Sequence, residues 1–171
     1  MIFSDATAAD ILELVELINA AYRNPGDKPG WTDERRLLEG PRTDSASLTS
    51  EMEGGRYLIA KERDDSPIVA CARITPEDDG AWYVASIAVK AAQQGCGWGR
   101  RLLDEIARRA RAANVWTLRI TVINLREELI AWYERRGFVR TGETEPFPYH
   151  DPRVGRPLRG DLVLVKLEMP L

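Results

Sequence analysis

The segment Gln94–Arg100 carries three glycines at alternate positions, directly before a pattern typical of an amphipathic helix. The first turn of a helix leaves backbone N–H groups without partners, and the aligned peptide dipoles attract anions to that end. Glycines permit positive φ angles and let a phosphate approach the backbone closely. The sequence therefore predicts that these amides hold a pyrophosphate, with Arg100 and Arg101 available as ion-pair partners.

Two phosphate-binding motifs do not fit this segment. The P-loop requires Lys followed by Ser or Thr after its last glycine, where this chain has Arg100 and Arg101. The dinucleotide fingerprint requires a small residue at its third position, which is Arg100, and an acid after the next strand, where Val122 and Ile123 stand. A glycine-rich helix start without any ligand is the plain alternative.

A second group that could do chemistry is the hydroxyl of Tyr133, about forty residues after the glycines. Tyr133 shares the apolar face of a predicted helix with Leu129 and Ile130. A phenol in this place is either a core tyrosine or a general acid. Cys96, at the start of a helix, has the position of an activated thiol, but the one histidine is remote in sequence, so we expect Cys96 to be a bystander.

The remaining pattern predicts the elements that position these groups. Thr7 and Asp10 form a capping box for a helix over Ala8–Arg23, which the turn NPGDKPG ends. Thr32 is expected to start a short helix that runs to Leu38. The other expected helices are a weaker one beginning at Asp44 or Ser45, one after the glycine segment, and one that Asn124 caps and that Gly137 ends in a left-handed conformation.

Strands are predicted between these helices. The segment Ala81–Lys90 is nearly apolar throughout, as expected of a strand buried on both faces, and a helix connects it to Val115–Val122 in a parallel crossover. Trp116 alternates with apolar residues of the second strand and is expected in the core. The other expected strands are RYLIAKER, IVACARIT, FVRTG and LVLVKLEM.

The composition restricts the classes of function. The 171 residues predict one domain over residues 1–171, and a net charge of −3 argues against nucleic acid as a partner. No apolar run is long enough to cross a membrane and no leader is visible, so a cytoplasmic protein is expected. Two cysteines and one histidine predict neither a disulfide framework nor a metal site.

Taken in order, Gln94, Gly97 and Gly99 form the pattern Q-x-x-G-x-G after an apolar strand, and LIAWYERRGFVRTGE follows about forty residues later. These two segments resemble the signatures of the GNAT superfamily of N-acetyltransferases. The resemblance implies an α/β (α+β) single-domain fold, with a mixed, mostly antiparallel sheet splayed between two central strands and flanked by helices. It also implies acetyl-CoA as co-substrate and direct acetyl transfer to a primary amine of a small molecule or peptide, and it allows a homodimer.

The same resemblance assigns roles to individual residues. Tyr133 would be the general acid that protonates the leaving thiolate. The cofactor-binding residues would be Ile87, Ala88 and Val89 for the pantetheine arm, Gln94, Gly95, Cys96, Gly97, Trp98, Gly99 and Arg100 for the pyrophosphate, and Asn124. No metal is implied. A non-catalytic acyl-CoA-binding sensor or regulatory module is the alternative function.

The chain departs from the family pattern at two places. Many relatives carry Asn seven residues before the tyrosine, where this chain has Arg126, and Asn124 is out of register by two. The strand Ala81–Lys90 contains no acid that could serve as general base, which leaves water, Tyr83, Glu143, Glu145 or Asp151.

The acceptor pocket is expected to involve residues from two loops. The loop around Trp31 and the loop with Phe147, Tyr149 and His150 are expected to cover that pocket. Five arginines either bind a carboxylate of the acceptor or are solvated: Arg35, Arg36, Arg42, Arg153 and Arg156.

Overall fold

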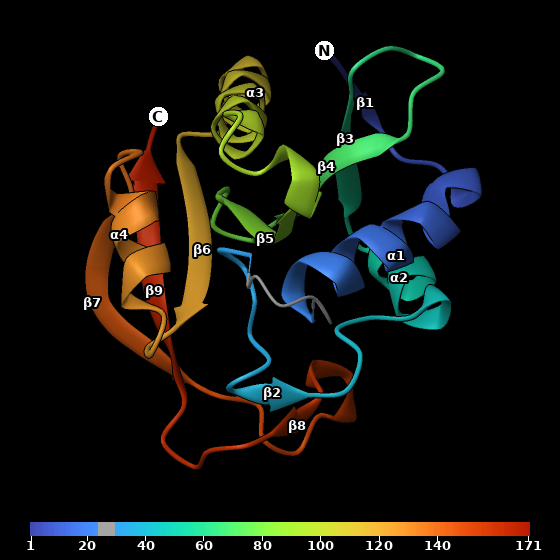
Figure 1. Ribbon diagram of the computed structural model, residues 1–171. Coiled ribbons are helices and arrows are strands. Elements are labelled where there is room, and N and C mark those ends of the chain that lie inside the picture. Colours follow the sequence, from blue (N-terminus) through green and yellow to red (C-terminus); the bar gives the residue numbers. More distant parts are fainter. Residues whose placement is uncertain (24–29) are drawn as a thin grey trace.

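The computed structural model describes residues 1–23 and 30–171 and is built on a seven-stranded sheet in the order β1-β3-β4-β5-β6-β9-β7 (Figure 1). The neighbours β5 and β6 are parallel and the other pairs are antiparallel, which confirms the predicted mixed sheet. The strands are β1 (Ile2–Asp5), β3 (Arg56–Lys61), β4 (Ile68–Pro76), β5 (Trp82–Val89), β6 (Thr117–Ile123), β7 (Val139–Pro146) and β9 (Val163–Pro170). A separate two-stranded ribbon joins β2 (Leu38–Glu39) to β8 (Arg156–Pro157).

Four α-helices cover the two faces of the sheet. Helices α1 (Ile11–Tyr22) and α2 (Ser45–Glu53) pack on one face, and α3 (Trp98–Ala112) and α4 (Glu127–Glu134) contribute to the core on the other. The alternation along β3 follows from these two layers, because Tyr57 and Ile59 face α1 whereas Leu58 and Ala60 face α3. In the described part of the chain, no helix combines the length and apolarity needed to cross a membrane.

The helix ends follow the predicted capping chemistry in three places. The backbone N–H of Thr7 donates to the Asp10 carboxylate at 2.8 Å, and a short 3-10 turn leads from there into α1. Asp44 caps α2 through the amide of Ser47 at 2.7 Å. After α4, Gly137 has φ +93, as expected of a left-handed C-cap. The turn predicted at residues 24–30 lies largely outside the described residues.

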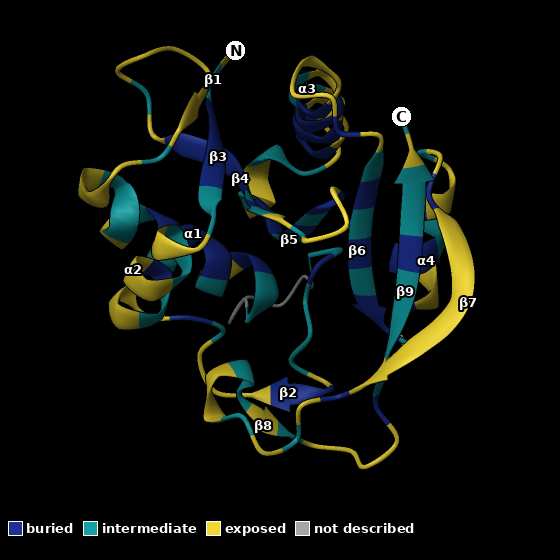
Figure 2. Ribbon diagram, turned by 180° about the vertical axis from the view of Figure 1, so that it is seen from behind, coloured by how far each residue is buried: buried dark blue, intermediate teal, exposed yellow. Residues whose placement is uncertain are grey.

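Two local predictions are wrong. The segment expected to form a helix from Thr32 to Leu38 consists of turns that lead into β2, and the Thr32 hydroxyl donates to the Ala21 carbonyl at 2.9 Å. Trp116 is 63 % exposed. The reason is the turn at Asn114, which has φ +58 and brings Val115 into the core before β6 begins. Figure 2 also shows the edge strand β7, which is exposed along its length.

Candidate active site

The central strands β5 and β6 separate after their first two residue pairs. In the described chain they pair at Trp82–Leu118 and Tyr83–Arg119 and no further along, although β5 stays paired with β4 as far as Val89. At the closed end, the Arg119 guanidinium contacts three carboxylates at once, those of Glu77, Asp79 and Glu168. Beyond this point the strands diverge, and a pocket lies between them that both strands line. This confirms the splayed sheet.

A bulge in β5 lies beside this opening. Ser86 has φ +49, and the register between β4 and β5 shifts between Cys71 and Arg73. The shift changes which residues face α3, from Trp82 and Val84 before the bulge to Ile87 and Val89 after it. Holding a non-glycine residue in this backbone conformation costs about 1–3 kcal/mol of free energy, and such residues cluster at functional sites.

The glycine segment opens α3 as predicted. Gly95 and Gly97 have φ +81 and +83, and a Cβ added at either would meet no described heavy atom within 4 Å. The first bond of the helix runs from the Arg101 amide to the Gly97 carbonyl at 3.0 Å. The amides that precede it, and that find no acceptor among the described residues, are those of Gly95, Gly97, Trp98, Gly99 and Arg100. They form an anion-binding cradle of five N–H groups.

Two residues that were predicted to bind the pyrophosphate have backbone amides that already donate within the chain. The Gln94 amide donates to Ala91 at 3.2 Å and the Cys96 amide to Gln93 at 3.4 Å, so neither is free for a ligand. The Gln94 side chain instead joins two segments: its Nε2 donates to the Val89 carbonyl at 3.1 Å, and its Oε1 accepts from the Trp31 amide at 3.3 Å. Gln94 therefore fixes the end of β5 and the loop at Trp31 against the cradle.

Aromatic and basic side chains form the walls of the cradle. Trp31 stacks on Trp132 at 4.6 Å between ring centroids, and the Arg136 guanidinium lies 3.5 Å from the Trp132 centroid. The cavity that they line has a volume of about 320 Å3. Arg136 Nε is buried without a hydrogen-bond partner among the described residues, and burial together with the nearby Arg135 and Arg100 lowers the pKa of Arg136. An anion in the cavity would relieve this unpaired charge.

The location of Trp31 differs from the prediction. We expected Trp31 to cover the acceptor site, but its ring lines the cradle and does not line the pocket between the strands. The reason is Arg126, whose buried guanidinium donates to the carbonyls of Trp31 and Thr32 and so holds this loop on the start of α4. Arg126 thus has a structural role at the position where many relatives carry Asn.

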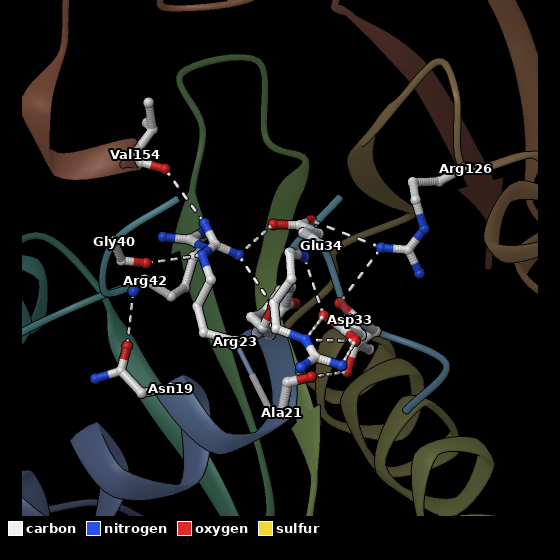
Figure 3. Close-up of polar contacts among 12 residues, drawn as sticks. Asn19, Ala21, Arg23, Asp33, Glu34, Gly40, Arg42, Arg126 and Val154 are labelled. Carbon is white, nitrogen blue, oxygen red and sulfur yellow. Dashed lines mark hydrogen bonds and ion pairs between the residues drawn. The ribbon is translucent and has the colours of Figure 1, made fainter. Parts of the chain in front are cut away.

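The pocket between the strands is the second cavity of the site, with a volume of about 190 Å3. It contains one carboxylate among its described lining residues, that of Glu34. Glu34 pairs with Arg23 at 2.9 Å and approaches Arg126 at 4.0 Å (Figure 3). The predicted aromatic contribution from the long loop is met in part, because Phe147 lines this pocket whereas Tyr149 and His150 do not.

Tyr133 lies on α4 and lines the same pocket. Its ring packs edge-on against Phe138 at 5.5 Å between centroids, and its hydroxyl makes no hydrogen bond within the described chain. Burial, followed by the nearby Tyr22, raises the pKa of the Tyr133 hydroxyl well above its ordinary value. The phenol is therefore neutral over the physiological range and can donate a proton.

Of the candidate general bases, some line the pocket between the strands and others lie outside it. Tyr83 lines the pocket and shares a 2.6 Å hydrogen bond with Thr121, and burial raises the pKa of its hydroxyl. Glu143 pairs with Lys166 and Asp151 with Arg153, and both carboxylates lie outside the pocket, as does Glu145. Glu34 was missed from the sequence, because the surrounding WTDERRLLEG carries no motif.

Asn124 is neither a helix cap nor a wall of either cavity. Helix α4 is capped at Arg126 instead. The Asn124 side chain accepts from the Val163 amide at 3.1 Å and donates to the Asp161 carbonyl at 3.2 Å, so it anchors the start of β9. Cys96 is exposed on the glycine segment and lines neither cavity of the site.

The described residues fit a CoA thioester. The cradle supplies N–H groups and an arginine nitrogen without a partner among the described residues for a pyrophosphate, and the second cavity, between the strands, is lined by Tyr133. The edge of Ile87–Val89 that faces β6 has no strand paired to it in the described chain, and it supplies backbone groups for an extended amide chain. Two of its carbonyls accept from side chains, that of Ile87 from the Tyr22 hydroxyl at 3.0 Å and that of Val89 from Gln94.

Comparisons with known proteins agree with this geometry. A sequence model described as the acetyltransferase (GNAT) family matches residues 12–138. A ribosomal-protein-alanine N-acetyltransferase from Brucella melitensis is 23 % identical, with all of both chains covered and a TM-score of 0.69. The protein smu.2055 from Streptococcus mutans is 18 % identical, with 99 % of both chains covered and a TM-score of 0.74.

A further similar structure carries a ligand. This protein from Bacillus anthracis, solved in complex with acetyl coenzyme A, is 19 % identical, with a TM-score of 0.57 over 69 % of this chain and 63 % of that one. No curated protein matches the sequence significantly. Because the family model spans most of the sequence and the fold agrees, the chain belongs to the GNAT family of acetyltransferases.

Proposed function

We propose that this acetyltransferase moves an acetyl group from acetyl-CoA directly to a primary amine of a small molecule or a peptide. The observation that carries the proposal is the hydroxyl of Tyr133, which lines the pocket between the splayed strands without a hydrogen-bond partner in the described chain. The complex of the similar Bacillus anthracis protein with acetyl coenzyme A supports the choice of donor. Acetyl-CoA supplies the acetyl group as a thioester.

The cradle residues would bind the coenzyme. The free amides of Gly95, Gly97, Trp98, Gly99 and Arg100 would donate to the pyrophosphate, and the edge Ile87–Val89 would pair with the pantetheine arm. Gln94 would act indirectly by holding this edge and the Trp31 loop in place. The amide of Cys96 is occupied, so Cys96 would contribute only backbone shape.

Tyr133 would act as general acid. Its neutral phenol would protonate the departing sulfur while the amine nitrogen forms its bond to the acyl carbon. The amine loses one proton in the same reaction, and this proton would leave through water or through the Tyr83 hydroxyl. Glu34 is held by Arg23 and Arg126, and we assign it the task of fixing these two arginines at the wall of the pocket.

The exchange of Tyr133 for Phe tests the mechanism. General acid assistance contributes about 10²–10⁴-fold, so Tyr133→Phe is expected to lower kcat at least tenfold without weakening CoA binding. Tyr149→Phe is the matched control, because its hydroxyl bonds to Leu162 outside the pocket and its loss should leave kcat unchanged. Unchanged turnover of Tyr133→Phe at saturating acetyl-CoA would remove Tyr133 from the mechanism.

Binding and turnover must be measured separately. Calorimetry with CoA and acetyl-CoA gives the affinity, and an assay of free thiol release across a panel of amines gives the activity. Absence of any CoA binding would refute the proposed function. Tight binding without turnover on a broad panel would instead identify a sensor or regulatory module.

A further inference from the structure

Arg23 and Arg126 contact Glu34 at the wall of the pocket between the strands, and a third arginine, Arg42, lines the pocket itself. Arg23 bonds to Glu34, to the Gly40 carbonyl at 3.0 Å and to the Val154 carbonyl at 3.3 Å. Arg126 holds the Trp31 loop. The guanidinium of Arg42 lines the same pocket and makes no hydrogen bond or ion pair with any residue that the structure describes.

The backbone of Arg42 is held firmly in place. Asn19 on α1 accepts from the Arg42 amide at 2.7 Å (Figure 3). It also accepts from the Thr43 amide at 3.1 Å and donates to the Thr43 carbonyl at 2.9 Å. These three bonds fix the backbone at Arg42 and Thr43, so that only the Arg42 side chain has freedom left to lose when it binds a ligand. Arg42 is therefore a cation on a fixed stretch of backbone, and the Tyr22 ring supports its side chain.

The Arg42 guanidinium lies close to the opening of the sheet. It sits over the ring of Tyr22, 5.4 Å from the ring centroid. The hydroxyl of that tyrosine donates to the Ile87 carbonyl on β5 at 3.0 Å. One tyrosine side chain thus separates the cation from the strand along which the proposed thioester would lie. A group bound at Arg42 and an amine at that strand are within the span of one small molecule.

The carboxylate that lines the pocket forms its ion pairs with other arginines. Glu34, the one carboxylate among the described lining residues, forms ion pairs with Arg23 and Arg126. Burial alone would lower the pKa of Arg42, but the nearby Tyr22, Glu34 and Glu51 raise it, so Arg42 stays charged. In the described chain no carboxylate oxygen bonds to its guanidinium, whose hydrogen-bonding edge is open to an anion. The planar guanidinium matches a carboxylate, with which it forms two parallel hydrogen bonds.

The other candidate arginines do not offer such a site. Arg153 pairs with Asp151 at 2.6 Å, and Arg35 pairs with Asp33 at 2.9 Å. Arg156 contacts Glu39 and is exposed. Arg36 is exposed and lines neither cavity of the site. The structure thus separates Arg42 from the four arginines that the sequence could not distinguish from it.

We propose that the acceptor is a small amine that carries a carboxylate, as an amino acid does, and that Arg42 binds this carboxylate and determines the specificity. The proposal rests on the proposed function, since it concerns the acceptor half of the same site. The pocket volume of about 190 Å3 suits a substrate of amino-acid size.

The test compares acceptors that differ only in their charge. Amino acids and their carboxamides are titrated by calorimetry into the protein saturated with CoA, and the same pairs are assayed for kcat/KM. We expect each acid to bind at least tenfold more tightly than its amide. Arg42→Met should bind both members of a pair equally, and Arg42→Lys should retain part of the preference. Arg36→Met, in the turn before β2 and outside the pocket, should behave as the unaltered protein.

The outcomes separate the two proposals. Equal binding of acids and amides by the unaltered protein would overturn the role of Arg42 while leaving acetyl transfer intact. A preference for phosphoethanolamine over β-alanine would overturn the carboxylate in favour of a phosphate. Failure to bind CoA at all would instead refute the proposed function, and CoA affinity also reports whether each variant is folded.

Discussion

The exchange of Gly97 for Ala tests the anion cradle most directly. Gly97 has φ +83, and forcing an L-residue into this region costs about 1–2 kcal/mol. The smaller freedom of Ala in the unfolded chain returns about 0.4–1 kcal/mol. No described heavy atom lies within 4 Å of the new Cβ, so no clash adds to this sum. The expected loss is about 1 kcal/mol, or roughly 2–4 °C in Tm for a chain of this size.

The same methyl group would stand where the pyrophosphate is proposed to bind. We therefore expect the Kd for CoA to rise at least tenfold, which is about 1.4 kcal/mol. Gly80 supplies the control, because it has φ +85 and equally open space, but it lies in the turn before β5 at the opposite end of that strand from the cradle. Gly80→Ala should lose the same stability and bind CoA normally.

Scanning calorimetry measures the two Tm values, and titration calorimetry measures the two affinities. If the Gly97 variant binds CoA as tightly as the Gly80 variant, the proposed cradle is refuted, because the two variants carry the same backbone strain. A loss of affinity in both would show that destabilisation alone weakens binding.

Three further outcomes are expected. Asn124→Ala should lower the free energy of unfolding by about 1–2 kcal/mol through the lost anchor of β9 and leave the Kd for CoA unchanged, as calorimetry will check. Trp116→Ser should change stability by less than about 0.5 kcal/mol in urea unfolding, whereas Leu118→Ala should cost about 2–5 kcal/mol; similar losses would contradict the observed burial. In thiol titration the exposed Cys96 should react at once, whereas Cys71, whose pKa burial raises to about 12, should react only after unfolding; a second fast thiol would count against this.

The parts of the site that the sequence predicted are those encoded in contiguous residues. The strand, the glycines and the helix of residues 81–112 follow one another, so periodicity and turn chemistry were sufficient to predict the cradle. The segment around Tyr133 was predictable for the same reason, since an apolar face, a basic pair and Gly137 lie within one short window.

The acceptor half of the site could not be predicted in this way. Glu34 and Arg42 lie in a segment of turns with no periodicity, and long-range contacts bring them to the pocket. Trp31 reaches the cradle because Gln94 and Arg126, far away in the sequence, bond to its backbone. Trp116 was predicted wrongly for a local reason. The alternation along the strand was recognised, but the turn at Asn114 places Val115 in the core and leaves Trp116 exposed.

The cluster around Arg119 has a consequence for how the molecule unfolds. It closes the sheet at one end, and beyond it β5 and β6 share no backbone bonds, so two half-sheets meet mainly through the side chains of the core. Regions with few backbone bonds between them open locally at a lower free energy than the whole fold. A ligand that spans the gap would raise this free energy, and slow amide exchange would then spread from β4 and β5 into β6 and β9. In this sense an extended ligand replaces a missing strand and makes the two half-sheets unfold as one cooperative unit.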